Sequence, residues 1–187
     1  MGAIGNVGVL ALQGDVREHV RLLKDMGATV RTVKTLPELE SVDAIVLPGG
    51  ESTTIGFLLE KFDLLEPLRK RIEDGMPTLG TCAGAILLAK NVTGGDIPKL
   101  AVLDATVHRN AYGSQIDSFE DDLDVEGAGR MHAVFIRAPV FESVGDDVEV
   151  LSTCRDHPVV VRQGNVIAAT FHPELADESG LHRLLIS

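Results

Sequence analysis

Short apolar runs alternate with longer amphipathic segments through the first half of the chain, and this order limits the possible folds. Four runs have the length and apolar character of a buried strand: residues 7–14, 29–34, 43–50 and 76–80. Between the first two runs, apolar residues recur at the spacing of a helix: Val16, Val20, Leu23 and Met26. Strands separated by helix-length segments pair in parallel. The order therefore predicts the α/β class, in three layers, with a mostly parallel central sheet flanked by helices.

The second half is richer in strands. Five further runs have strand character: residues 101–109, 132–139, 148–154, 158–163 and 166–172. Gly164 and Asn165 between the last two predict a hairpin, and residues 179–187 predict a short closing helix. No repeat or linker interrupts this order, so we expect one domain over residues 1–187.

Composition excludes several function classes. The net charge is −11 and no basic stripe is present, which argues against nucleic acid as a partner. No apolar stretch reaches the roughly 18 residues that span a bilayer, so we expect no membrane partner. The first residues lack the basic leader and cleavage site of a secretory signal. These features together predict a cytoplasmic protein.

The two cysteines, Cys82 and Cys154, can form one disulfide at most and do not resemble a disulfide framework. A reducing compartment is therefore expected. No Cys/His cluster has the spacing of metal ligands, so we expect neither a metal nor a cofactor. Cys154 follows a strand and is interpreted as structural, whereas Cys82 has a different setting.

The segment LGTCAGAILLA (79–89) places Cys82 between Gly80 and Gly84, where a strand turns into a helix. Such a turn strains the central residue and leaves no room for a Cβ at the flanking positions. It also sets the sulfur beside a helix N-terminus, which favours thiolate. The backbone N–H of Ala83 would face an oxyanion formed on an attacked carbonyl. Free cysteine is often simply buried, so the motif alone leaves a structural role open.

A thiol nucleophile needs a base, and the base needs a group that orients it. His172 follows a strand in ATFHPEL, and Glu174 comes two residues later. In an extended segment these side chains share one side, and Pro173 keeps the segment out of a helix. A surface His-Pro-Glu turn is the alternative, but with the cysteine turn the pair predicts a Cys82–His172–Glu174 triad. The other histidines have no obvious partner: His19, His108, His132, His157 and His182.

The loop LPGGEST (47–53) is the third candidate element. Gly49 and Gly50 allow a backbone N–H to turn inward as a second oxyanion donor. The alternative is a plain strand-to-helix loop in which Ser52 or Thr53 caps the next helix. No lysine follows as a phosphate-binding loop requires.

Together, the cysteine turn, the PGGEST loop and the FHPE segment resemble class I glutamine amidotransferase domains. The similarity is closer to one family within that class, the glutaminase subunits of pyridoxal 5′-phosphate synthase. Six blocks spanning nearly the whole chain carry it: VGVLALQGDVREH, LPGGESTTI, GTCAGAILLA, VHRNAYGSQIDSFE, VFIRAP and RQGNVIAATFHPEL. The resemblance implies a flavodoxin-like fold and hydrolysis of L-glutamine to glutamate and ammonia through a thioester on Cys82. It also implies that a separate synthase subunit receives the ammonia within a multi-subunit complex.

The resemblance also assigns the substrate contacts. The positions that match the glutamine-binding residues of the family are Gly50, Glu51, Ser52, Arg109, Ile136 and Arg137. A free amino acid offers a carboxylate that needs cations or backbone donors and an ammonium that needs acceptors. Without the family, Arg109 and Arg137 would be interpreted as ordinary surface arginines.

Two residues depart from the family pattern. Tyr112 stands where phenylalanine is more frequent, and Ser114 stands where arginine is common. A contact made by that arginine, for instance with the partner subunit, is therefore not carried over to this chain. The triad residues are unaffected.

Two alternative functions stay open. One is the glutaminase subunit of another amidotransferase, such as imidazole glycerol phosphate synthase, against which the LALQGD and VFIRAP blocks argue. The other is a non-catalytic, thiol-bearing interaction protein on the same scaffold. The His172–Glu174 pair argues against the second, because such a protein needs no oriented base.

Overall fold

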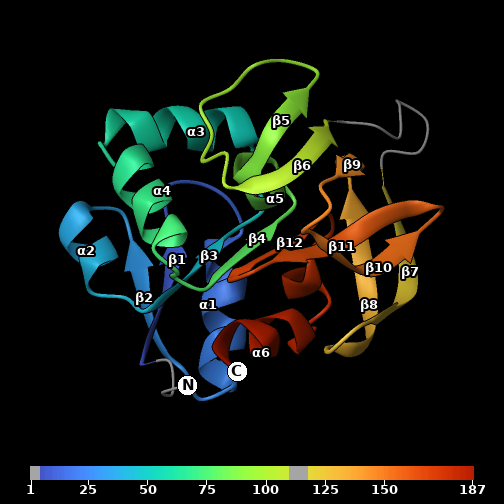
Figure 1. The fold of residues 1–187 in the computed structure, drawn as a ribbon. Helices are drawn as coiled ribbons and strands as arrows, with labels where there is room; N and C mark the ends of the chain where they lie inside the picture. Colours follow the sequence, from blue (N-terminus) through green and yellow to red (C-terminus); the bar gives the residue numbers. More distant parts are fainter. Residues whose placement is uncertain (1–4, 110–117) are drawn as a thin grey trace.

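A computed structural model describes residues 5–109 and 118–187 (Figure 1). Tyr112 and Ser114 lie outside the described residues. The central sheet is built from β1 (Asn6–Leu10), β2 (Thr29–Val33), β3 (Ala44–Leu47), β4 (Thr78–Thr81), β10 (Glu149–Cys154), β11 (His157–Gln163) and β12 (Val166–Ala169). The helices are α1 (Val16–Asp25), α2 (Leu36–Glu40), α3 (Ser52–Lys61), α4 (Leu65–Glu73), α5 (Ala83–Leu88) and α6 (Gly180–Ile186), with one 3₁₀ turn, η1 (Pro173–Leu175).

The sheet confirms the predicted α/β class. Its seven strands run in the order β10-β11-β12-β4-β3-β1-β2. The five strands from β12 to β2 pair in parallel, and β10, β11 and β12 pair antiparallel. Gln163 faces Val166 across the turn, which confirms the predicted hairpin.

Helices cover both faces of the sheet (Figure 1), and its central strands β3, β4 and β12 are buried on both sides. In β3, Ala44 and Val46 join one core, and Ile45 and Leu47 join the other. Helices α2 to α5 cover the second core, and α1 and α6 cover the first. This confirms the three-layer prediction.

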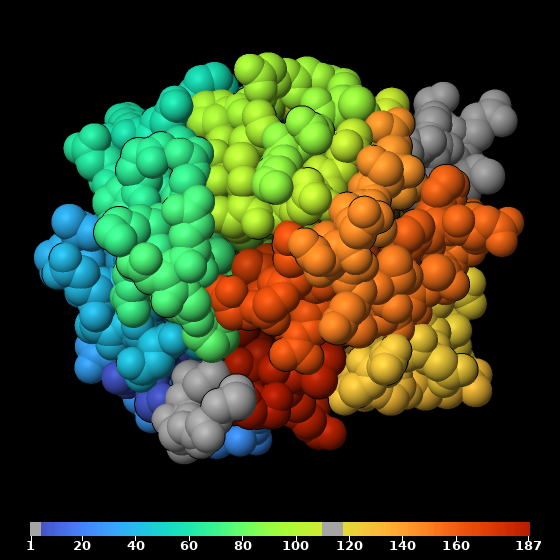
Figure 2. Space-filling model, in the orientation of Figure 1, coloured from blue at the N-terminus to red at the C-terminus, as the bar shows by residue number. Residues whose placement is uncertain are grey.

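Two smaller sheets adjoin the central one. They consist of β5 (Ala89–Thr93), β6 (Leu103–His108) and β9 (Val140–Val144), and of β7 (Ser118–Val125) and β8 (Gly129–Ile136). In the space-filling view, the C-terminal segment (dark red) lies between the N-terminal half and the yellow β7–β8 hairpin (Figure 2). Helix α6 is thus held in the body of the molecule. Within residues 5–109 and 118–187, no helix combines the length and the apolar character that crossing a membrane requires.

Some local features were not predicted, for identifiable reasons. The buried residues of α1 are His19, Leu22 and Leu23, whereas Val16 and Val20 are only partly buried. The predicted helix therefore forms, and a histidine that its apolar spacing did not single out points into the core. Strand β7 carries the acidic segment 120–124 at the protein surface, where only Leu123 and Val125 of the strand are buried. An edge strand of this kind lacks the strong hydrophobic pattern by which the other strands were found. Strands β5 and β9 and the short helix α2 were not predicted either, and β5 begins inside the segment expected to continue α5.

Candidate active site

Cys82 lies between β4 and α5 in a strained backbone conformation, with φ 47° and ψ −101°. A Cβ on Gly80 would come within 2.7 Å of the backbone carbon of Gly84, and one on Gly84 within 2.1 Å of the carbonyl oxygen of Leu47. Neither position can hold a side chain without moving the backbone. The backbone N–H of Cys82 donates to the carbonyl of Ala169 at 2.8 Å, which fixes the turn to β12. The predicted geometry of the turn is confirmed.

His172 is anchored three residues beyond β12, where its backbone N–H donates to the carbonyl of Val134 at 2.9 Å. The prediction of an extended segment here was wrong, because Pro173–Leu175 form a 3₁₀ turn. Pro173 fits at its first position, where no N–H is needed. Even so, the predicted contact forms, with Nδ1 of His172 2.8 Å from Oε1 of Glu174.

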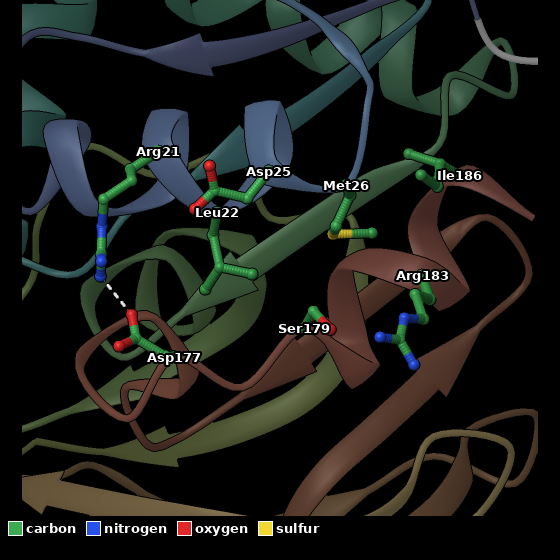
Figure 3. A pocket seen from close by; sticks show the side chains of 8 residues that line it. All are labelled: Arg21, Leu22, Asp25, Met26, Asp177, Ser179, Arg183 and Ile186. Atoms are coloured by element: carbon green, nitrogen blue, oxygen red, sulfur yellow. Dashed lines mark hydrogen bonds and ion pairs between the residues drawn. The ribbon is translucent and has the colours of Figure 1, made fainter.

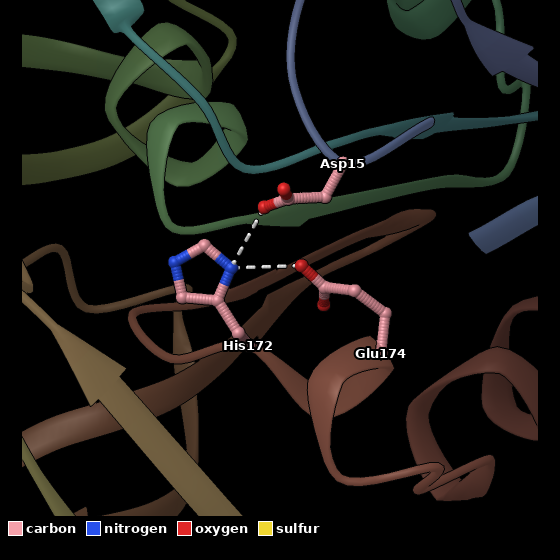
Figure 4. A group of neighbouring side chains, drawn as sticks. All are labelled: Asp15, His172 and Glu174. Carbon is pink, nitrogen blue, oxygen red and sulfur yellow. Dashed lines mark hydrogen bonds and ion pairs between the residues drawn. The ribbon is translucent and has the colours of Figure 1, made fainter. Parts of the chain in front are cut away.

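This contact fixes the state of the imidazole. A carboxylate oxygen only accepts hydrogen bonds, so Nδ1 of His172 carries the proton. Figure 4 shows that the second ring nitrogen, Nε2, points away from the carboxylates. Nε2 is therefore the atom that is free to exchange a proton with a reacting group.

Asp15 is a site residue that sequence reasoning missed. Its Oδ2 lies 3.2 Å from Nδ1 of His172, so two carboxylates face one nitrogen (Figure 4). Its backbone N–H donates to the carbonyl of Gly49 at 3.0 Å, which holds the loop before α1 against the PGGEST loop. In the sequence, Asp15 is simply a polar residue at a helix start. Only the fold brings it to His172.

The charges around His172 favour its protonated form. Burial alone would lower the pKa of His172, but hydrogen bonds with Asp15, Cys82 and Glu174 outweigh it and raise the pKa well above the ordinary value. Burial raises the pKa of Glu174, and the hydrogen bond from His172 opposes that rise. The protonated form of His172 is therefore favoured beside Cys82.

A hollow of about 460 Å³ opens over Cys82 and His172. It brings together the predicted substrate contacts Gly50, Glu51, Ser52, Arg109, Ile136 and Arg137. Glu174 and Ala83 are buried and do not line it. Four lining residues were not predicted: Gln13, Asp15, Ile86 and Leu175. Gln13 and Asp15 come from the loop after β1, and their exposed, polar character gave no sign of a role.

Glu51, and neither Ser52 nor Thr53, caps α3, which corrects that prediction. Its carboxylate accepts from the backbone N–H groups of Thr53 at 3.2 Å and Thr54 at 2.7 Å. Arg109 donates to Oγ1 of Thr53 at 3.1 Å and lies 3.5 Å from the Glu51 carboxylate. A cation is thereby fixed beside the hollow.

The glycines of the PGGEST loop are required by close approach. A Cβ on Gly49 would lie 2.3 Å from Cε1 of His172, and one on Gly50 would lie 2.5 Å from Oε1 of Gln13. The same Gln13 oxygen accepts the backbone N–H of Glu51 at 2.8 Å. The loop therefore passes directly against the imidazole. The role of Gly50 and Ala83 as oxyanion donors stays a prediction.

Asp15, His172 and Glu174 also form a set that could hold a metal ion, since their ligand atoms lie within 4.8 Å of one another. Sequence spacing gave no hint of it. An ion there would need the lone pair of Nδ1 and so would remove the proton that Glu174 accepts. The 2.8 Å contact fits a hydrogen bond, so the donor set suits an oriented base better than a metal centre.

Comparison with known proteins identifies the family of this chain. The model of the SNO glutamine amidotransferase family matches residues 9–187. A protein of Mycolicibacterium vanbaalenii named pyridoxal 5′-phosphate synthase subunit PdxT is 55% identical over 97% of this chain and 96% of its own. A Thermus thermophilus protein of the same name is 54% identical over 97% and 96% of the two chains.

Solved structures support the same grouping. One described as a glutamine amidotransferase has a TM-score of 0.92 and 53% identity over 96% of both chains. Another, a glutamine amidotransferase from Thermotoga maritima, has a TM-score of 0.61 at 18% identity, over 93% of this chain and 77% of its own, and shows the fold alone. The family model, the relatives and the fold lead to one conclusion: this chain belongs to the SNO glutamine amidotransferase family.

Proposed function

We propose that this chain is the glutaminase subunit of a pyridoxal 5′-phosphate synthase, in which residues 1–187 act as one glutaminase domain. It would hydrolyse L-glutamine to glutamate and ammonia and pass the ammonia to a synthase subunit. The observation that carries the reaction type is the Nδ1–Oε1 contact of 2.8 Å behind an imidazole that shares a hollow with the strained Cys82. The shared name of relatives about 55% identical carries the assignment to this synthase.

The first half of the reaction forms a thioester. The Cys82 thiolate attacks the side-chain amide carbon of glutamine, and the backbone N–H groups of Gly50 and Ala83 stabilise the resulting oxyanion. Nε2 of His172 donates its proton to the amide nitrogen, and ammonia leaves as the C–N bond breaks. Glu174 holds the imidazole throughout.

The second half releases glutamate. Neutral His172 takes a proton from water at Nε2, and the hydroxide attacks the thioester carbon. The C–S bond breaks and the thiolate of Cys82 returns beside the imidazolium. One water is consumed, and glutamate and ammonia are the products.

The hollow offers groups of both charges for a free amino acid. Arg109 and Arg137 would face the carboxylate of glutamine, and Glu51 with the backbone of Gly50 and Ser52 would face its ammonium. Ile136 would border the methylene groups. A neutral amide side chain would then extend toward Cys82.

The chain would work in the cytoplasm, in a complex with the synthase subunit. The nucleophile must stay reduced, and both cysteines, which lie among the described residues, are free. Ammonia is lost to water from an open site, so we expect the partner to cover it and complete it. The relatives reported above carry the pyridoxal name, which disfavours a glutaminase for imidazole glycerol phosphate synthesis. The oriented imidazole disfavours a non-catalytic role.

The test is ammonia release from L-glutamine with the synthase subunit present. We expect Cys82→Ala to abolish release and Cys154→Ala, at the other cysteine, to retain it. A diazoketone analogue of glutamine should label Cys82 and spare Cys154. Equal ammonia release by wild type and Cys82→Ala would refute the proposed function.

A further inference from the structure

Two buried histidines, which the proposed reaction does not use, lie behind the triad. His19 on α1 and His182 on α6 are both 0% exposed. Nδ1 of His19 lies 2.8 Å from Nε2 of His182. On its other side, Nε2 of His19 lies 3.2 Å from Oγ1 of Thr81 and 3.5 Å from Oε2 of Glu174. The contacts form a chain from α6 through α1 to the carboxylate that holds His172.

Within the part of the chain that the structure describes, Glu174 lacks a hydrogen-bond donor at one carboxylate oxygen, and the two buried histidines are placed to supply one. Its Oε1 accepts from His172, but its Oε2 is buried and has no hydrogen-bond partner among the described residues. A buried carboxylate oxygen without a donor is costly. Nε2 of His19 lies 3.5 Å from this oxygen, longer than an ordinary hydrogen bond, and stabilises it electrostatically only in the tautomer that carries the proton on Nε2.

If both imidazoles are neutral, the hydrogen bonds that link His182, His19 and Glu174 can run in only two directions. Burial, with charge repulsion from His182 and His172, lowers the pKa of His19, and burial lowers the pKa of His182 to about 4. Each ring then has one N–H and one lone pair. In the first direction, His182 donates from Nε2 to His19, and His19 turns its Nε2–H to Glu174 and Thr81.

In the reverse direction, His19 donates from Nδ1 to Nε2 of His182. This arrangement has one advantage and one larger cost. It would let Nδ1–H of His182 interact with the carbonyl of Glu178, which lies near enough to raise the pKa of that ring. In the first direction Nδ1 of His182 has no hydrogen-bond partner within residues 5–109 and 118–187, but it is an unprotonated acceptor. The reverse would turn a lone pair of His19 toward the ionised Glu174. Repulsion at a buried carboxylate is the greater penalty.

We propose that His19 and His182 are positioning residues for the glutaminase reaction: His182 sets the tautomer of His19, and His19 donates from Nε2 toward Oε2 of Glu174. The proposal rests on the proposed function. With donors on both oxygens, Glu174 stays ionised and cannot rotate away from His172. These hydrogen bonds also make the orientation of the His172 imidazole depend on the packing of α1 against α6.

The contact between α1 and α6 is separate from the active site. It borders a surface hollow of about 610 Å³, lined by residues such as Arg21, Asp177 and Arg183 (Figure 3). Arg21 of α1 is paired with Asp177, in the loop that precedes α6. None of the triad residues lines this hollow. The buried residues His19 and His182 lie on α1 and α6, the two helices that border this hollow.

A matched pair of substitutions tests the role of His19 in the complex with the synthase subunit. His19→Leu removes the donor, and His19→Gln keeps an N–H near the position of Nε2. We expect His19→Leu to lower kcat for ammonia release about tenfold or more, with little change in KM, because substrate binds on the other side of His172. His19→Gln should recover most of the loss. His157→Gln, at an exposed histidine, is the control.

A pH profile separates positioning from a merely structural role. The groups that face Glu174 are His172, His19 and Asp15, with the Thr81 hydroxyl beside His19. Losing the donor raises the pKa of Glu174, so the acid limb of kcat/KM should move to higher pH in His19→Leu and return in His19→Gln. A folded His19→Leu with wild-type kcat and acid limb would overturn the proposal while leaving the function intact.

Nitrogen-15 NMR of the full wild-type chain tests the direction without any variant. Long-range ¹H–¹⁵N spectra should show His19 and His182 protonated at Nε2 and unprotonated at Nδ1. His19 protonated at Nδ1 would overturn the proposal even if His19→Leu failed to fold. Absence of ammonia release by wild type with its partner would instead refute the proposed function, and the NMR result would still decide the direction.

Discussion

Two carboxylates face the same nitrogen of His172, yet they lie in opposite surroundings. Glu174 is 2.8 Å away, fully buried, and backed by His19. Asp15 is 3.2 Å away, its side chain is 35% exposed, and it borders the hollow that receives substrate. One side of the imidazole is sealed and the other is open.

The difference separates two tasks. A buried hydrogen bond resists rotation because the alternative is an unpaired group in a dry interior. An exposed carboxylate is hydrated when it moves away, so it contributes charge more than orientation. We therefore expect Glu174 to position His172 and Asp15 to adjust its pKa.

Glu174→Gln should have the largest effect. A carboxylate can accept from both His172 and His19, whereas an amide has one accepting oxygen and must turn its NH₂ toward one of these donors. We expect kcat to fall about a thousandfold, or roughly 4 kcal/mol of transition-state stabilisation, with KM little changed. Steady-state ammonia release with the partner present measures it.

The double variant sharpens that prediction. In Glu174→Gln with His19→Leu, the amide can aim its oxygen at His172 because no donor remains on the other side. The double variant should then be more active than Glu174→Gln alone. Equal losses in the single and double variants would mean that His19 does not contact Glu174 productively.

The buried histidine pair behind Glu174 should also make the free energy of unfolding fall at acid pH. His182 has a pKa lowered from 6.5 to about 4 by burial, so the unfolded chain binds a proton at this residue more readily. Its contribution to stability is complete above about pH 6.5 and is lost as pH falls toward 4, by about 3 kcal/mol in total. The groups facing it are His19 and the carbonyl of Glu178.

Urea unfolding at several pH values measures this effect against a variant. His182→Gln should show a smaller loss of unfolding free energy between pH 7 and pH 4 than wild type does. His157→Gln, at an exposed histidine, should behave like wild type. An unchanged slope in His182→Gln would mean that water reaches the ring.

Local motifs and long-range contacts of the site differ in how far the sequence predicts them. The cysteine turn, the PGGEST loop and the His172–Glu174 pair are local, and each was recognisable because a few adjacent residues meet one geometric demand. Gly80 and Gly84 must lack a Cβ, and that requirement is visible in the sequence. The parallel sheet was predictable for a similar reason, since short apolar runs such as β3 alternate with helix-length segments.

The sealed network could not be found in this way. His19 and His182 lie 163 residues apart, and each is surrounded by ordinary helical sequence. The apolar spacing of α1 did not single out His19, because a histidine with a buried partner does not look like a core residue. Asp15 was missed because its partner comes from the opposite end of the chain.

Asp15→Asn should have a smaller effect than Glu174→Gln. Its hydrogen bond raises the pKa of His172 against the lowering effect of burial, together with those of Cys82 and Glu174. Removing the charge lowers that pKa, so the alkaline limb of kcat/KM should move to lower pH, with a few-fold loss of activity near neutrality. A loss as large as that of Glu174→Gln would remove the distinction between the two carboxylates.

Metal removal should change activity least. If Asp15, His172 and Glu174 act as a hydrogen-bonded group, chelation with EDTA leaves ammonia release unchanged, because no ion takes part. Added Zn²⁺ should inhibit, since it competes with the proton for Nδ1 of His172. Asp15→Asn should weaken this inhibition by removing the exposed ligand, whereas His132→Gln, at a histidine on the β7–β8 hairpin, should not. Loss of activity on chelation, restored by metal, would show that the three residues hold a working ion and that the two carboxylates share one task.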